Sequence, residues 1–223
     1  DYPKAAGYYR QAVEVYESVL GKDHPSTLDT LSSQADMLVE QGKYAEAELL
    51  YHRIIAGQKK MLGDQHPSYA SALLGMGTLW REKGNFRAAE PYFREALEIN
   101  RKVYGEKGPG YAAALNYLGA LRWSQGNYPE ALTYFEKAQG IFREAYGERG
   151  SSYARTLSNI GSALGMQGKY LESEEYHRKA VETYIATFGP DHSYVALAQN
   201  NLADNYVGLS DFAEAERLLR RTT

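Results

Sequence analysis

A repeat of 42 residues constrains the fold of this chain more than any other feature. A glycine after an apolar residue recurs at this interval through the whole sequence, at Gly21, Gly63, Gly105, Gly147 and Gly189. A second series contains Gly42, Gly84, Gly126 and Gly168, with Ser210 as its exception. An aromatic residue follows two positions later, at Tyr44, Phe86, Tyr128, Tyr170 and Phe212. A fixed period over the full length predicts an array of stacked, equivalent units.

Each unit has the pattern of two helices joined by a short turn. Apolar residues recur at helical spacing in residues 110–125, and Gly126 with Asn127 favours a turn. Tyr128, Ala131 and Phe135 then share one face of a second helix. We therefore expect an all-α solenoid of antiparallel helix pairs in a single array over residues 1–223. Its predicted segments are a lone second helix at 1–20 and helix pairs at 26–62, 68–104, 110–146, 152–188 and 194–223.

Small residues recur inside the first helix of the units, at Ala35, Gly77, Gly119, Gly161 and Ala203. A glycine inside a helix costs about 1 kcal/mol relative to alanine. Its repetition therefore indicates that the partner helix approaches closely. We expect Ala131 and its equivalents to form the other side of this contact, with the recurring aromatic side chains filling the space around it.

The connectors between units contain a histidine in three copies, as in LGKDHPSTL, LGDQHPSYA and FGPDHSYVA. We expect each glycine to end one helix and the following residues to turn the chain, with Ser68 as the N-cap of the next helix. Ser26 with Asp29 resembles a capping box. The histidines are expected to bond within the turn, because ligands in successive units would be about 8–10 Å or more apart, too far for one metal ion.

Composition excludes several classes of function. The formal net charge of -3 argues against nucleic acid as the main partner. With no cysteine, the chain has neither disulfides nor thiolate metal sites, which fits a reducing compartment, and we expect a cytoplasmic protein. No apolar run is long enough to span a bilayer, so no membrane partner is expected. P-loop, nucleophile-elbow and HExxH motifs are absent, so we expect no enzyme, no cofactor and no catalytic or metal site.

The order of these features resembles the tetratricopeptide repeat, which usually has a period of about 34 residues. The longer unit and its Leu-Gly-x-x-His-Pro connector are similar to the repeats of kinesin light chains and their bacterial relatives. The resemblance covers the whole chain and implies a bacterial source. It also implies a right-handed superhelix whose first helices line a concave groove. Both ends look truncated, so we expect an excerpt of a longer protein.

The first helix of the third full unit predicts which face is free. Leu115, Leu118, Gly119 and Arg122 form its buried stripe. The opposite stripe contains Ala113, Asn116, Tyr117, Ala120 and Ser124, with Trp123 at its edge. This composition resembles a peptide-contacting surface.

Kinesin light chains carry an Asn-Asn pair in this helix, and the second asparagine bonds peptide backbone in the groove. Asn200 and Asn201 match the pair, Asn159 matches its second member and Asn116 its first. We take these asparagines as candidate peptide contacts. The alternative is that they bond to one another or to water.

Three arginines, Arg81, Arg122 and Arg155, are spread over consecutive units near the same face, so an acidic peptide is one candidate ligand. The alternative is ion pairing with acids such as Glu82 and Asp204, and Asp204 is itself a candidate groove residue.

The predicted function is a non-catalytic module that binds a peptide or a segment of a partner protein. The alternative is a regulatory array that controls an effector domain, such as a protease or a nucleotide-binding domain, in a larger bacterial protein. End-to-end self-association is a further option. His177, near Glu174 and Glu175, belongs to the packed aromatic series, so we expect it in the core.

Overall fold

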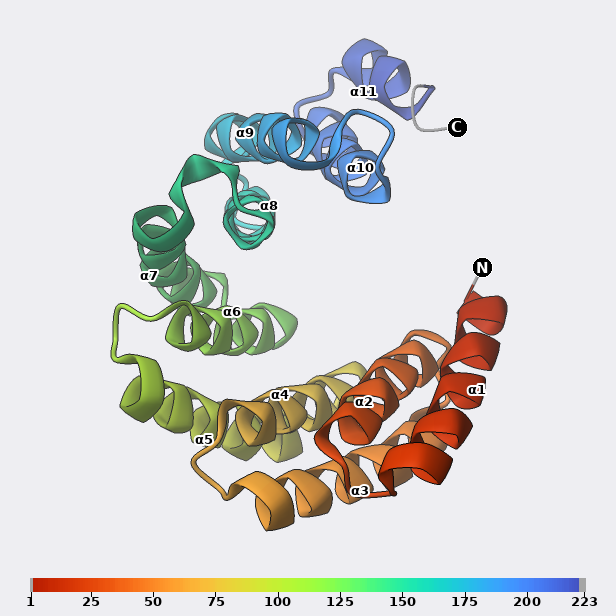
Figure 1. Ribbon diagram of the computed structural model, residues 1–223. Helices are drawn as coiled ribbons and strands as arrows, with labels where there is room; N and C mark the ends of the chain where they lie inside the picture. The colour runs from red at the N-terminus through yellow and green to blue at the C-terminus, as the bar shows by residue number, and fades with distance from the viewer. Residues whose placement is uncertain (1, 221–223) are drawn as a thin grey trace. The chain divides into compact units, whose positions relative to one another are not determined.

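The computed structural model describes residues 2–220, and within them it contains helices and no strand. The expected all-α array of helix pairs is therefore confirmed (Figure 1). Asp1 and residues 221–223, which belong to the predicted segments 1–20 and 194–223, lie outside the described residues. The chain divides into two compact units, Asp1–Gly105 and Glu106–Thr223. The prediction of a single repeat array stays a prediction.

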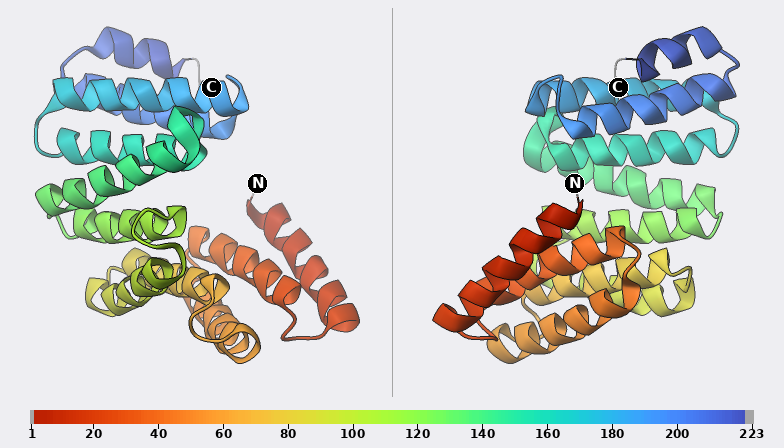
Figure 2. Two further views of the ribbon diagram at one scale, coloured as in Figure 1. Left: turned by 60° about the vertical axis from the view of Figure 1, so that its left-hand side comes forward. Right: turned by 90° about the vertical axis from the view of Figure 1, so that its right-hand side faces the viewer.

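The helix bounds follow the repeat. The first unit holds α1 (Tyr2–Leu20), α2 (Pro25–Glu40), α3 (Tyr44–Leu62), α4 (Pro67–Glu82) and α5 (Phe86–Tyr104). The second holds α6 (Pro109–Ser124), α7 (Tyr128–Tyr146), a 3-10 turn η1 (Gly147–Arg149), α8 (Ser151–Gly165), α9 (Tyr170–Phe188), α10 (Ser193–Gly208) and α11 (Phe212–Leu219). Within the second unit, α6 to α11 follow one another as packed helix pairs, green to blue in Figure 2.

The connector histidines cap the helices that follow them. The Nδ1 atoms of His24, His66 and His192 accept hydrogen bonds from backbone N–H groups two residues later, at 3.1–3.2 Å. The expectation that they bond within the turn is therefore confirmed. The prediction that Ser68 is the N-cap is wrong, because His66 holds that position and Pro67 occupies the first turn. A histidine nitrogen replaces the hydroxyl oxygen that usually accepts this bond.

The glycines inside the first helices make room for a ring and not for an alanine. A Cβ atom built on Gly77 would lie 2.5 Å from Phe93, and one on Gly119 would lie 2.5 Å from Phe135. On Gly161 it would lie 2.8 Å from the ring of His177. The close approach of the partner helix is thus confirmed, but the side chain over each glycine is the large one that follows Ala131 or its equivalent by four residues.

Candidate functional site

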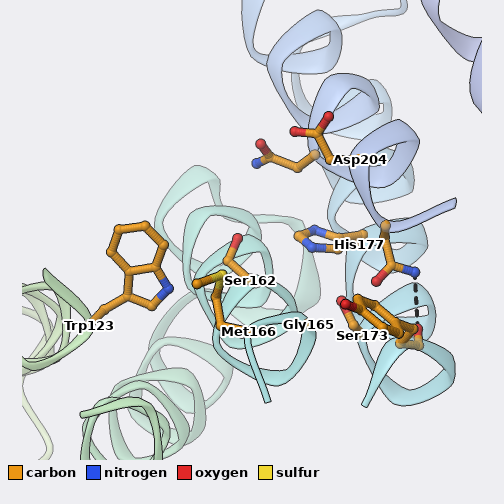
Figure 3. Close-up of a pocket in the computed structure, with 10 residues that line it drawn as sticks. Trp123, Ser162, Gly165, Met166, Ser173, His177 and Asp204 are labelled. Atoms are coloured by element: carbon orange, nitrogen blue, oxygen red, sulfur yellow. Dashed lines mark hydrogen bonds between the residues drawn. The ribbon is translucent and has the colours of Figure 1, made fainter. Parts of the chain in front are cut away.

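A pocket of about 400 Å³ lies within the second unit. Four helices line it, and Figure 3 shows their side chains converging from α6, α8, α9 and α10. The lining residues are Trp123, Ser162, Gly165, Met166, Tyr170, Ser173, His177, Asn201, Asp204 and Asn205. This volume falls within the range of about 300–1,000 Å³ that is typical of ligand pockets.

The α9 wall of the pocket is built around His177. The side chain is buried, with 3% exposed, and it packs against Gly161 as Phe135 packs against Gly119. Its Nδ1 atom has no hydrogen-bond partner among the described residues. Burial lowers the pKa of His177 to about 4, so the ring is neutral near pH 7. Its neighbour Ser173 donates a hydrogen bond to the carbonyl oxygen of Gly161 at 2.8 Å.

The α10 wall presents oxygen atoms. The Nδ2 atom of Asn205 donates to the carbonyl oxygen of Tyr170 at 3.0 Å. Its Oδ1 atom is buried and has no partner in the described part of the chain. Because an amide turned the other way would place two oxygens against each other, this bond fixes which end of the amide stays open. Asp204 is exposed beside it, and Asn201 is half-buried.

The opposite wall is apolar. Trp123 of α6 keeps 38% of its surface exposed, and Met166 of α8 keeps 53%. The indole contacts Tyr128 edge to face, with ring centroids 6.3 Å apart. Exposed Trp and Met side chains beside a pocket are typical of interaction surfaces.

Four of the lining residues depart from the repeat. His177 replaces the aromatic ring, and Ser173 replaces the alanine of the other units. Asn205 stands where other units hold Met37, Leu79, Leu121 and Ala163. Gly165 stands where they hold Val39, Arg81, Trp123 and Val207. Two polar replacements and one missing side chain therefore produce an opening in a layer that is packed in the other units.

The structure brings three predicted site residues together at this pocket, namely Trp123, Asn201 and Asp204. Tyr117 and Asn159 are half-buried, while Arg155 and Asn200 are exposed, and none of these four lines the pocket. Their role in binding stays a prediction.

Asn116 does not lie on the free face. Its side chain is 4% exposed, and its Nδ2 atom donates to the hydroxyl of Thr156 at 2.7 Å. It therefore joins α6 to α8. The predicted stripe is otherwise as expected, because Leu115, Leu118, Gly119 and Arg122 are buried and Ala113, Ala120 and Ser124 are half-buried.

The arginines are largely engaged by acids of the chain. Arg122 is 8% exposed, and its guanidinium donates to Glu130 at 2.8 Å and to Gln125 at 3.0 Å. Arg81, in the first unit, pairs with Glu82 at 2.5 Å. The expected alternative of ion pairing holds for these two residues, with Glu130 as the partner of Arg122.

Sequence reasoning missed His177 and Asn205 as pocket residues. The information was present, because both are polar side chains in register positions that are apolar in the other units. His177 was assigned to the core, which its burial confirms. The pattern of one unit could not indicate that the same ring also lines an opening between helices of successive units.

Two searches within residues 2–220 bear on other functions. None of the helices combines the length and hydropathy needed to cross a bilayer. No group of three His, Cys, Asp or Glu side chains in this part of the chain is arranged to hold a metal ion.

Comparison with solved structures gives the same fold. BtubC (BKLC) from P. vanneervenii is 19% identical, with a TM-score of 0.73 over 100% of this chain and 89% of that chain. A candidate kinesin light chain of nearly identical repeats from Podosopora anserina is 22% identical, with a TM-score of 0.66 over 89% of this chain and 94% of that chain. A Rap protein complexed with Competence and Sporulation Factor is 16% identical, with a TM-score of 0.72 over 99% of this chain and 69% of that chain.

The family comparison covers nearly all of the sequence. No curated protein matches the chain. The tetratricopeptide repeat model matches residues 1–60, 68–144, 110–184 and 152–223. Repeats of this family generally form non-catalytic scaffolds. The chain belongs to the tetratricopeptide repeat family, and its repeats resemble those of kinesin light chains.

Proposed function

We propose that this chain is a non-catalytic module that binds a segment of a partner protein, with the pocket of the second unit at the centre of the binding surface. The observation that carries the proposal is the pair of buried, unpartnered atoms there, Oδ1 of Asn205 and Nδ1 of His177. A buried polar atom without a partner costs about 1–3 kcal/mol. A ligand that supplied the missing hydrogen bonds would recover that energy.

The surroundings of the pocket support the same function. Trp123 and Met166 offer exposed apolar surface, while Asn201 and Asp204 offer polar groups that can orient a peptide. The solved complex of the Rap protein supports the proposal at the level of fold, since an array of this kind accommodates a second molecule.

A random-peptide display selection on the full chain, followed by binding measurements on the enriched peptide, tests the function. Asn201→Ala removes an amide that lines the pocket, whereas Asn200→Ala removes its exposed neighbour on the same helix. We expect Asn201→Ala to weaken binding about tenfold or more, as for loss of one well-formed polar contact. Asn200→Ala should stay within about twofold, because it removes an amide outside the pocket.

Two results would contradict the proposal. One is a selection that enriches no motif although circular dichroism shows a folded, helical chain. The other is an equal loss of affinity in both variants, which would place the binding surface outside the pocket.

A further inference from the structure

The charge of the pocket is one-sided. Asp204 carries a carboxylate, and none of the other nine lining residues carries a charge near pH 7, because burial lowers the pKa of His177 to about 4. No described residue forms an ion pair with Asp204. The arginines that suggested an acidic ligand lie elsewhere, with Arg122 already bonded to Glu130. A carboxylate in this pocket would therefore face an acid and would find no cation.

The hydrogen-bonding capacity of the pocket is also one-sided. The amide of Asn205 gives its donor end to Tyr170, so only its acceptor oxygen is open. The neutral ring of His177 can leave Nδ1 as a second acceptor. With the carboxylate of Asp204, the pocket offers acceptors at several separate positions. Its occupant must therefore present several N–H donors.

The apolar wall limits the shape of that occupant. Trp123 presents an indole beside the pocket, and Met166 adds a polarisable side chain. A cation over an indole face is attracted by the ring quadrupole. A guanidinium group is planar, stacks on aromatic faces and carries five donors, whereas an ammonium group is a compact, strongly hydrated point charge.

We propose that the pocket formed by Trp123, Asp204, Asn205 and His177 binds the guanidinium group of an arginine in the partner segment. This inference rests on the proposed function and adds the chemistry of the residue that is recognised. It assigns the carboxylate of Asp204 to the charge, the Oδ1 atom of Asn205 to an N–H donor and the indole of Trp123 to the planar face.

The two tryptophans of the chain give a direct test by nuclear magnetic resonance. The indole N–H signal of Trp123 reports on the pocket, and that of Trp80, in the first unit, serves as an internal reference. The ¹⁵N-labelled chain is titrated with N-acetyl-arginine amide. N-acetyl-citrulline amide has the same shape without the charge, and N-acetyl-lysine amide has the charge without the plane.

We expect the arginine probe to shift the Trp123 signal in a saturable way and to leave Trp80 unchanged. The citrulline and lysine probes should bind at least about threefold more weakly. Asp204→Asn should weaken the arginine probe about fivefold, the upper end for a partly exposed ion pair. Asp191→Asn removes an equal charge from an exposed loop of the same unit and should have no effect.

Three results would overturn the inference. They are equal binding of arginine and citrulline, equal binding of arginine and lysine, and no shift of Trp123 with any probe. A selection that enriches a motif without arginine, and loses it in Asn201→Ala, would keep the proposed function and reject only this inference. Failure of both experiments would reject both.

Discussion

At the scale of single residues, His177 differs from its equivalents in one physical respect. Tyr51, Phe93 and Phe135 fill the same buried position, and Phe93 and Phe135 pack against glycines as His177 does. A neutral imidazole can take this place, but a charged one would be desolvated without a counter-ion. The pKa of about 4 in the folded state therefore lies below the value of about 6.5 for an unfolded chain.

This difference predicts how stability depends on pH. Between pH 6.5 and pH 4 the unfolded chain binds a proton at His177 that the folded chain does not. The free energy of unfolding should therefore fall by up to about 3 kcal/mol as pH drops through this window. His177→Phe removes the effect, so its stability advantage over the natural sequence should grow toward low pH in urea unfolding experiments.

A reciprocal variant provides the control. Phe93→His places an imidazole over Gly77, in the same local geometry, and should introduce the same pH dependence into the first unit. If the stability difference between the natural sequence and His177→Phe were constant from pH 7 to pH 4.5, the account of His177 as a buried neutral ring would be wrong.

At the scale of elements, the turn between α10 and α11 departs from the other turns within helix pairs. Ser210 adopts a φ of 62°, the one non-glycine residue between 2 and 220 with a positive φ. The turn is closed by the same hydrogen bonds as the one at Gly168, from residues 210 and 211 to the carbonyls of Val207 and Tyr206. A side chain in this conformation costs about 1–2 kcal/mol.

Ser210→Gly should therefore stabilise the chain. Relief of the strain exceeds the added entropy of the unfolded glycine, leaving a net gain of about 0.5–1 kcal/mol in the free energy of unfolding. Gly168→Ser, at the matching turn, should lose a similar amount. Thermal unfolding of the two variants measures both effects, and an equal response to both substitutions would refute the argument from backbone strain.

Sequence reasoning predicts elements of this kind well and their surroundings less well. The glycine and aromatic series indicate where helices begin and end, because both follow from local backbone requirements. Ser68 was predicted wrongly because a histidine nitrogen can also accept the capping bond. Asn116 was predicted wrongly because the hydroxyl of Thr156 that it contacts belongs to the next helix pair. A pattern within one repeat does not contain that neighbour.

At the scale of the whole molecule, binding depends on where the repeat is broken. Within the second unit, the residues that depart from the repeat, at 165, 173, 177 and 205, meet at one pocket. The repeat itself gives the scaffold, and the departures give this chain its individual surface. An analysis that searched only for the regular pattern would find the fold and miss the site.

The most direct test of this account is to fill the pocket at Gly165, where the other units carry a larger side chain. A Cβ atom there meets its nearest neighbour, the hydroxyl of Ser173, at 3.4 Å, so a side chain can be added and would extend into the open space. Gly140→Leu is the matched control, because a Cβ atom at that helical glycine of α7 meets nothing within 4 Å and Gly140 does not line the pocket.

The measurement is the affinity of the selected peptide, by fluorescence anisotropy, for the natural sequence and the two variants. The account predicts that Gly165→Leu weakens binding more than about tenfold, because the ligand and the new side chain compete for one space. Gly140→Leu should bind as the natural sequence does. Full affinity of a folded, helical Gly165→Leu chain would contradict the claim that this pocket is the binding site.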